Sequence, residues 1–222
     1  MNKEWSELNK TMQLELKKKE SITSGIATLL ALRKGLMEQM VAFKAQLAAE
    51  DFSAMPYRNV KGYHSKTVAY SLWHIFRIED IVAHTLIAGD QQVFFRGDYQ
   101  RKINSPIITT GNELAGEEIV DFSKTLCLDE LYAYMDEVNA ASTKILENLA
   151  YEDIKLKIPD EKREVLENLG VVSKDEKAWW LIDYWCGKDI KGLIQMPFSR
   201  HWIMHVEACI RIREKLLSAR SI

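Results

Sequence analysis

The chain has 222 residues, of which 47% are hydrophobic and 28% charged, so it holds ample apolar material for one soluble domain spanning residues 1–222. Its 30 basic and 32 acidic residues leave a net charge of −2, and no basic stripe is interleaved with aromatic residues, which argues against a nucleic-acid partner. The apolar runs are far too short to span a bilayer and residues 1–10 lack the apolar core of a secretory signal, so we expect no membrane association.

The number and spacing of the cysteines indicate a reducing cellular compartment. There are three, widely spaced and without a CxxC pair: Cys127, Cys186 and Cys209. An odd number of isolated cysteines is typical of reduced thiols, so we expect a cytoplasmic protein.

The first predicted helix covers about residues 21–48. Two ladders of apolar residues with a seven-residue spacing run along it. They are Ile22, Leu29, Leu36 and Phe43 in one ladder, and Ile26, Met40 and Leu47 in the other. Arg33 interrupts the second ladder. Its side chain is expected either to extend to water or to project into a polar pocket inside the protein.

Three further segments have the apolar spacing of amphipathic helices: residues 66–88, 128–149 and 198–217. The first of these ends at Gly89, a natural C-terminal cap. The last begins near Pro197 and Ser199, which suit the first turn and the cap of a helix. Because strand patterns are scarce, the chain is predicted to be all-α, with these helices packed as a four-helix bundle.

Two long connections separate the predicted helices. Residues 89–127 are long enough for a crossover that leaves the helices on either side parallel. Residues 150–196 form an insertion that is predicted to be helical, with short helices in 161–170 and 174–189. Four aromatic residues stand close together in the second of these: Trp179, Trp180, Tyr184 and Trp185. They form either a plug over the core or the wall of an aromatic pocket.

The histidines carry the clearest chemical signal. His201 and His205 lie four residues apart, so both leave the same, apolar face of the fourth helix. They are either ordinary core histidines or ligands of a metal ion, which would satisfy one nitrogen of each. His74 is also predicted to point inward from the second helix, whereas His64 and His84 are predicted at the surface. Three inward imidazoles would form a tri-histidine site with open coordination positions.

Other metal and catalytic motifs are absent or incomplete. A zincin protease needs HExxH, but Trp202 stands where the glutamate would be. A carboxylate-bridged di-iron bundle needs ExxH, and no histidine has a glutamate three residues before it. No CxxCH motif marks a covalent haem and no glycine-rich loop would hold a phosphate. A Ser–His–Asp or Cys–His hydrolase stays open, although no nucleophile stands in a recognisable elbow. Cys209, one turn after His205, is interpreted as a buried structural thiol.

Three stretches together resemble the DinB-like (YfiT-type) helical-bundle proteins. They are SLWHIFRIEDIVAHTLIAG, LDELYAYMDEVNAASTKILENL and PFSRHWIMHVEACIRIR, and the resemblance covers most of residues 20–150 and 197–217. It implies that His74, His201 and His205 are the metal ligands. It also implies an up-down-down-up bundle with its crossover at 89–127, and a homodimer. The enlarged insertion at 150–196 departs from the family pattern and leaves the substrate class in doubt.

The resemblance further implies a function. Family members of known activity resemble metal-dependent transferases and isomerases that use a low-molecular-weight thiol such as bacillithiol, mycothiol or glutathione. We therefore expect one divalent metal ion, zinc or nickel, and a thiol S-transferase that joins a small thiol to an electrophile. Arg33 or Arg200 is expected near a substrate carboxylate. The alternative is a non-catalytic metal-binding or oligomeric stress-response protein with the same bundle.

Overall fold

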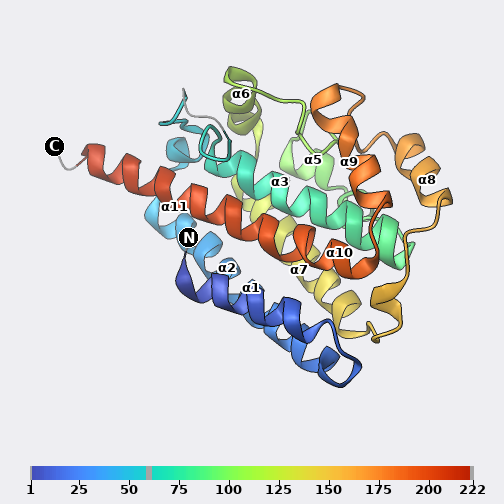
Figure 1. Cartoon of the computed structure of the whole chain (residues 1–222). Coiled ribbons are helices and arrows are strands. Elements are labelled where there is room, and N and C mark those ends of the chain that lie inside the picture. Colours follow the sequence, from blue (N-terminus) through green and yellow to red (C-terminus); the bar gives the residue numbers. More distant parts are fainter. Residues whose placement is uncertain (1, 59–61, 221–222) are drawn as a thin grey trace.

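The structure is a computed structural model that describes residues 2–58 and 62–220 (Figure 1). Every regular element within these ranges is a helix and none is a strand, so the predicted all-α class is confirmed. A single β-bridge, between Lys157 and Asp189, is the extent of the sheet-like pairing in these ranges. None of the described helices combines enough length with enough apolar character to cross a membrane.

The long helices lie where the sequence predicts them. They are α2 (Ile22–Gln46), α3 (Val68–Asp80), α7 (Leu128–Glu147) and α11 (His201–Arg220). Both α2 and α3 contact α7 and α11. Figure 1 shows α3 and α11 lying side by side along much of their length. The residues of α3 are all buried, because neighbouring elements cover it on every side.

Two of these helices adjoin π-helical turns. The segment η3 (Ile81–Ala88) continues α3 and ends at Gly89, which has the left-handed φ of 73° predicted for a C-terminal cap. The segment η5 (Met196–Arg200) precedes α11 and contains Pro197 near its start. Ser199 is not the predicted cap, because its hydroxyl donates backwards to the carbonyl of Ile194 at 2.9 Å.

The sequence reading did not predict the helix α1 (Lys3–Glu15), which packs against α2. Trp5 and Met12 are buried, so α1 extends the apolar core. The end of α1 approaches α2 closely at Gly25, where an added Cβ would lie only 2.9 Å from the Leu16 side chain. The apolar face of α1 is short and lies in a strongly charged segment, which is why its pattern is weak in the sequence.

Both long connections contain short helices. The first contains α4 (Val93–Arg96), α5 (Tyr99–Ile103) and α6 (Glu117–Thr125). The insertion contains η4 (Asp153–Lys155), α8 (Glu161–Leu169), α9 (Glu176–Cys186) and α10 (Ile190–Ile194), which confirms the helical prediction. The remaining short turns are η1 (Lys19–Ser21) and η2 (Ala49–Ser53).

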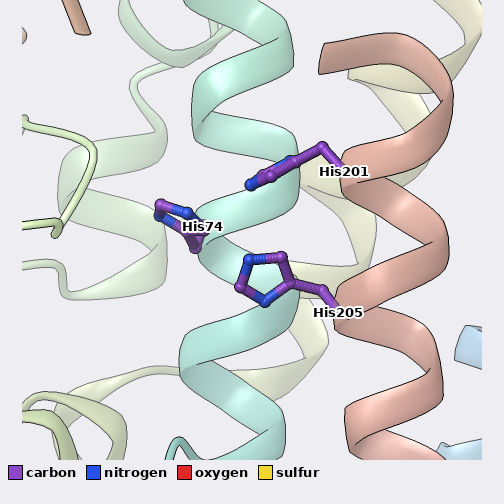
Figure 2. Close-up of side chains that lie close together, drawn as sticks. All are labelled: His74, His201 and His205. Carbon is purple, nitrogen blue, oxygen red and sulfur yellow. The ribbon is translucent and has the colours of Figure 1, made fainter. Parts of the chain in front are cut away.

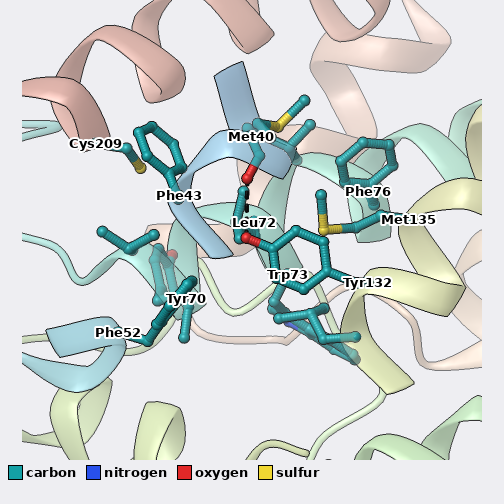
Figure 3. Close-up of a cluster of buried hydrophobic side chains, with 14 of the residues drawn as sticks. Met40, Phe43, Phe52, Tyr70, Leu72, Trp73, Phe76, Tyr132, Met135 and Cys209 are labelled. Atoms are coloured by element: carbon teal, nitrogen blue, oxygen red, sulfur yellow. Dashed lines mark hydrogen bonds between the residues drawn. The ribbon is translucent and has the colours of Figure 1, made fainter. Parts of the chain in front are cut away.

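Two clusters of buried apolar residues form the core. The first joins α2, α3, α7 and α11, and Figure 3 shows part of it, including Phe43, Trp73 and Met135. Within it, the Tyr132 hydroxyl donates to the carbonyl of Met40 at 2.9 Å. The second cluster contains much of the insertion, including the buried Trp185 of α9. The insertion is therefore part of the packed core rather than a loose appendage.

A buried ion pair joins the long helices. Arg33 on α2 makes a two-pronged contact with Glu79 on α3, with nitrogen–oxygen distances of 2.7 and 2.8 Å. The same guanidinium donates to Asn139 and Ser142 on α7, at 2.8 and 3.0 Å. It also lies 4.2 Å from the ring centroid of Trp202 on α11. Of the two predicted positions for Arg33, the structure supports the interior one, because the side chain is 2% exposed.

Candidate metal centre

Three histidines from two helices converge on one point. His74 lies on α3, and His201 and His205 lie on the first two turns of α11. One potential ligand atom from each lies within 4.8 Å of the other two. The ring centroids are 4.6 to 5.0 Å apart, and Figure 2 shows the rings turned towards one another. The three side chains predicted to point inward are therefore close enough to hold one metal ion.

The three imidazoles are buried, and two of them have a nitrogen without a hydrogen-bond partner. Their exposed fractions are 5% for His74, 7% for His201 and 2% for His205. The Nδ1 atoms of His201 and His205 are buried without a hydrogen-bond partner. Orphaned buried nitrogens are costly, so two of them beside a third imidazole are not explained by ordinary core packing. A set of three neutral imidazole donors at this spacing fits a bound divalent metal ion.

A backbone contact fixes the state of His74. Its Nδ1 lies 2.7 Å from the carbonyl oxygen of Thr110, in the connection between α5 and α6. Because a carbonyl can only accept, Nδ1 carries the hydrogen and Nε2 keeps its lone pair for a metal. Such an outer hydrogen bond is the usual way in which a metal-binding imidazole is oriented.

Burial keeps the three rings neutral. Loss of solvation lowers the pKa of His74 to about 4; the hydrogen bond to Thr110 opposes this shift and the charge of Lys66 adds to it. The pKa values of His201 and His205 are lowered well below 6.5 by burial and by the neighbouring imidazoles. Metals bind the unprotonated form, so at neutral pH the site is available without the release of a proton from these rings.

The other two histidines lie outside the site. His64 is partly exposed, and its Nε2 lies 2.6 Å from the guanidinium of Arg211. The prediction that His84 lies at the surface is wrong, because it is only 2% exposed. Its Nδ1 lies 2.6 Å from the carboxylate of Asp90, and α7 and α8 contact the π-helical turn that carries it. His84 lies on another side of the helix from His74, but α7 and α8 cover that side as well.

Cys209 is a buried thiol outside the histidine group. No cluster in the described part of the chain brings its sulfur together with the three imidazoles. Burial raises its pKa to about 12, and a hydrogen bond with Ser71 partly opposes that shift. Figure 3 places Cys209 beside Phe43 in the apolar core, as expected of a structural thiol.

The histidines open into a pocket with a volume of about 450 Å³. One wall comes from α9 of the insertion, through Trp180, Leu181, Tyr184 and Trp185. This placement supports the pocket-wall interpretation of the aromatic cluster, although Trp185 also packs into the core. Trp180 is 49% exposed, so a large aromatic surface stands at the pocket.

The opposite wall contains residues that the sequence reading did not select. Tyr70 stacks on His74 with a centroid distance of 5.4 Å, and Tyr63 meets the His205 ring edge-on at 4.7 Å. Lys66 and Asn112 line the same pocket. Tyr70 stands one helical turn before His74, a spacing that could have identified it. Asn112 lies in a connection, where no local pattern predicts the position of a side chain. Lys66, predicted as the first residue of the second helix, lies two residues before α3 begins.

The two arginines proposed for a substrate carboxylate do not line this pocket. Arg33 is buried and paired with Glu79, so nothing in the structure supports its predicted place near a substrate carboxylate. Arg200 is exposed and lines a hollow against α1 instead. Its charge still acts on Tyr63 and Tyr184, whose pKa values are raised by burial and partly lowered by Arg200.

Comparison with known proteins adds no assignment. The chain matches no protein-family model, and a search of curated proteins finds no match. Inference about function therefore depends on the geometry and chemistry of the histidine site and its pocket.

Proposed function

We propose that this protein binds one divalent metal ion, zinc or nickel, through His74, His201 and His205, and transfers a low-molecular-weight thiol to an electrophile. The observation that carries the proposal is the convergence of three neutral, buried imidazoles beside a pocket of about 450 Å³. Three protein ligands leave coordination positions for a substrate, as is typical of catalytic rather than structural zinc. The proposal includes a cytoplasmic location, which the isolated cysteines favour, and a homodimer, which the family resemblance implies.

We also propose that the chain is a DinB-like bundle of up-down-down-up topology. The contacts of α2 and α3 with both α7 and α11 support this arrangement. So does the long connection between η3 and α7, which is long enough to return the chain to the end from which α3 started. The metal-binding residues would then lie on the second and fourth helices of the bundle, with the insertion beside them.

The proposed chemistry is activation of a thiol by a metal ion at the histidine site. A divalent metal held by His74, His201 and His205 would lower the pKa of a thiol bound in the pocket and so favour the thiolate, the form that attacks an electrophile. Three neutral imidazoles leave the positive charge of the ion undiminished, and the carbonyl of Thr110 keeps His74 in the ligating tautomer. The aromatic wall of α9 excludes water from one side and offers apolar surface to the electrophile.

Cobalt-substituted protein provides the test of thiol binding. Adding a small thiol should produce a thiolate-to-cobalt charge-transfer band, because the metal has free positions and the pocket admits the ligand. Cys209→Ala should leave the band unchanged, since the Cys209 sulfur is not part of the histidine group. The measurement is an absorption titration of both proteins.

Two results would contradict the proposal. A sulfur band present before any thiol is added, and absent in Cys209→Ala, would show a closed structural site. Protein that binds cobalt but gives no band with any thiol would indicate a non-catalytic metal-binding protein, the alternative considered from the sequence.

A further inference from the structure

The charge balance of the histidine pocket is unusual. None of the described residues that line it is an aspartate or a glutamate. Burial raises the pKa values of Tyr63 and Tyr70, so neither phenol supplies negative charge at neutral pH. With three neutral imidazole ligands, a bound divalent ion would keep its full charge of two. Glu113 acts on Tyr70 by its charge but does not line the pocket, so no described acidic side chain faces a metal ion held there.

Lys66 adds a further positive charge to this pocket. Its side chain is partly buried, and within the described residues it has no carboxylate at ion-pair distance. The ammonium lies 4.8 Å from the ring centroid of Tyr70, the residue that stacks on His74. Lys66 lines the same pocket as the three histidines. An ammonium that lines a pocket and has no carboxylate partner is free to pair with an anionic group of a ligand.

A second polar group faces the same space. Asn112 also lines the pocket, and its side-chain oxygen is buried without a hydrogen-bond partner. It is an acceptor for an N–H group of a ligand. The pocket thus combines these two polar groups with the aromatic side chains that α9 contributes.

We propose that the thiol substrate carries a carboxylate, and that Lys66 binds this carboxylate while the thiolate occupies the metal. Such a ligand would bring two negative charges to a pocket that would hold a metal ion and that has a lysine and no acidic side chain among its described lining residues. The ammonium of Lys66 supplies the charge-assisted hydrogen bond that a neutral thiol cannot use. This inference rests on the proposed function, and it assigns to Lys66 the selection of the thiol.

The test compares two thiols of similar size on cobalt-substituted protein: 3-mercaptopropionate and the neutral 3-mercapto-1-propanol. We expect the wild type to bind the carboxylate about tenfold more tightly, as judged from the charge-transfer band. In Lys66→Met this preference should fall to within about twofold, because the positive charge is lost. Lys66→Arg should retain most of the preference, because the guanidinium keeps that charge. Lys174→Met, which changes an exposed lysine outside the pocket, is the matched control.

The outcomes separate this inference from the proposed function. Cobalt content and circular dichroism of each variant are measured first, so that loss of the metal or of the fold is distinguished from loss of selectivity. Equal binding of both thiols by the wild type would overturn the role of Lys66 and leave thiol binding intact. A preference that survives in Lys66→Met would mean that the carboxylate chelates cobalt directly, which also overturns it. No band with either thiol would contradict the proposed function itself, and the inference with it.

Discussion

Replacing Glu79 with glutamine is expected to lower the free energy of unfolding by about 3–5 kcal/mol, because it leaves the charge of Arg33 buried and uncompensated. Arg33 is 2% exposed and Glu79 is fully buried, so solvent cannot take over the lost contact. The pair also anchors Asn139 and Ser142 of α7, and its loss disturbs three helices at once. Urea unfolding followed by circular dichroism measures the effect.

Two controls make this prediction specific. Asp129→Asn breaks the exposed pair with Lys44 and should cost at most about 1 kcal/mol. The double variant Arg33→Met with Glu79→Leu should be more stable than either single variant, because it removes both buried charges. A Glu79→Gln protein within about 1 kcal/mol of the wild type would show that the pair is hydrated or dispensable.

Substitution of any of the three clustered histidines is expected to reduce metal affinity at least about 100-fold, because only two protein ligands would remain. His74→Ala, His201→Ala and His205→Ala should behave alike, since the three rings share one site. Metal-binding titrations against a competing chelator measure the change. Metal should also raise the unfolding temperature of the wild type and not of these variants, because it binds only the folded site.

The remaining histidines are the matched controls. His64→Ala removes a partly exposed ring and should change neither metal affinity nor stability appreciably. His84→Ala should retain the metal but lose stability, because a buried ring paired with Asp90 is removed. A loss of metal in His84→Ala equal to that in His201→Ala would contradict the ligand assignment.

The sequence predicted those features that depend on periodicity within one helix. Apolar spacing identified the four long helices, and the four-residue spacing of His201 and His205 showed that they share a face. Burial of His74 followed from its place beside an apolar stripe. The convergence of all three required knowledge of how α3 and α11 pack, which the resemblance supplied and the residue pattern alone did not.

Features that depend on contacts between distant segments were missed. The apolar pattern of its own helix predicts His84 at the surface, yet α7 and α8 contact the turn that carries it. The sequence does not decide whether the Arg33 side chain extends to solvent or into the interior, because its partner Glu79 lies 46 positions away. Lys66 and Asn112 reach the pocket from connections, where backbone conformation is set by tertiary contacts rather than by local propensity.

The central claim is that three histidines hold one divalent metal ion and leave its other positions open. X-ray absorption at the metal edge, on protein purified without chelators and analysed for metal content, tests it most directly. We expect about one ion per chain, with three imidazole nitrogens at about 2.0–2.1 Å if the metal is zinc, and solvent but no sulfur completing the shell. Protein that takes up no divalent metal, or whose metal is bound by sulfur or by fewer than three imidazoles, would contradict the claim.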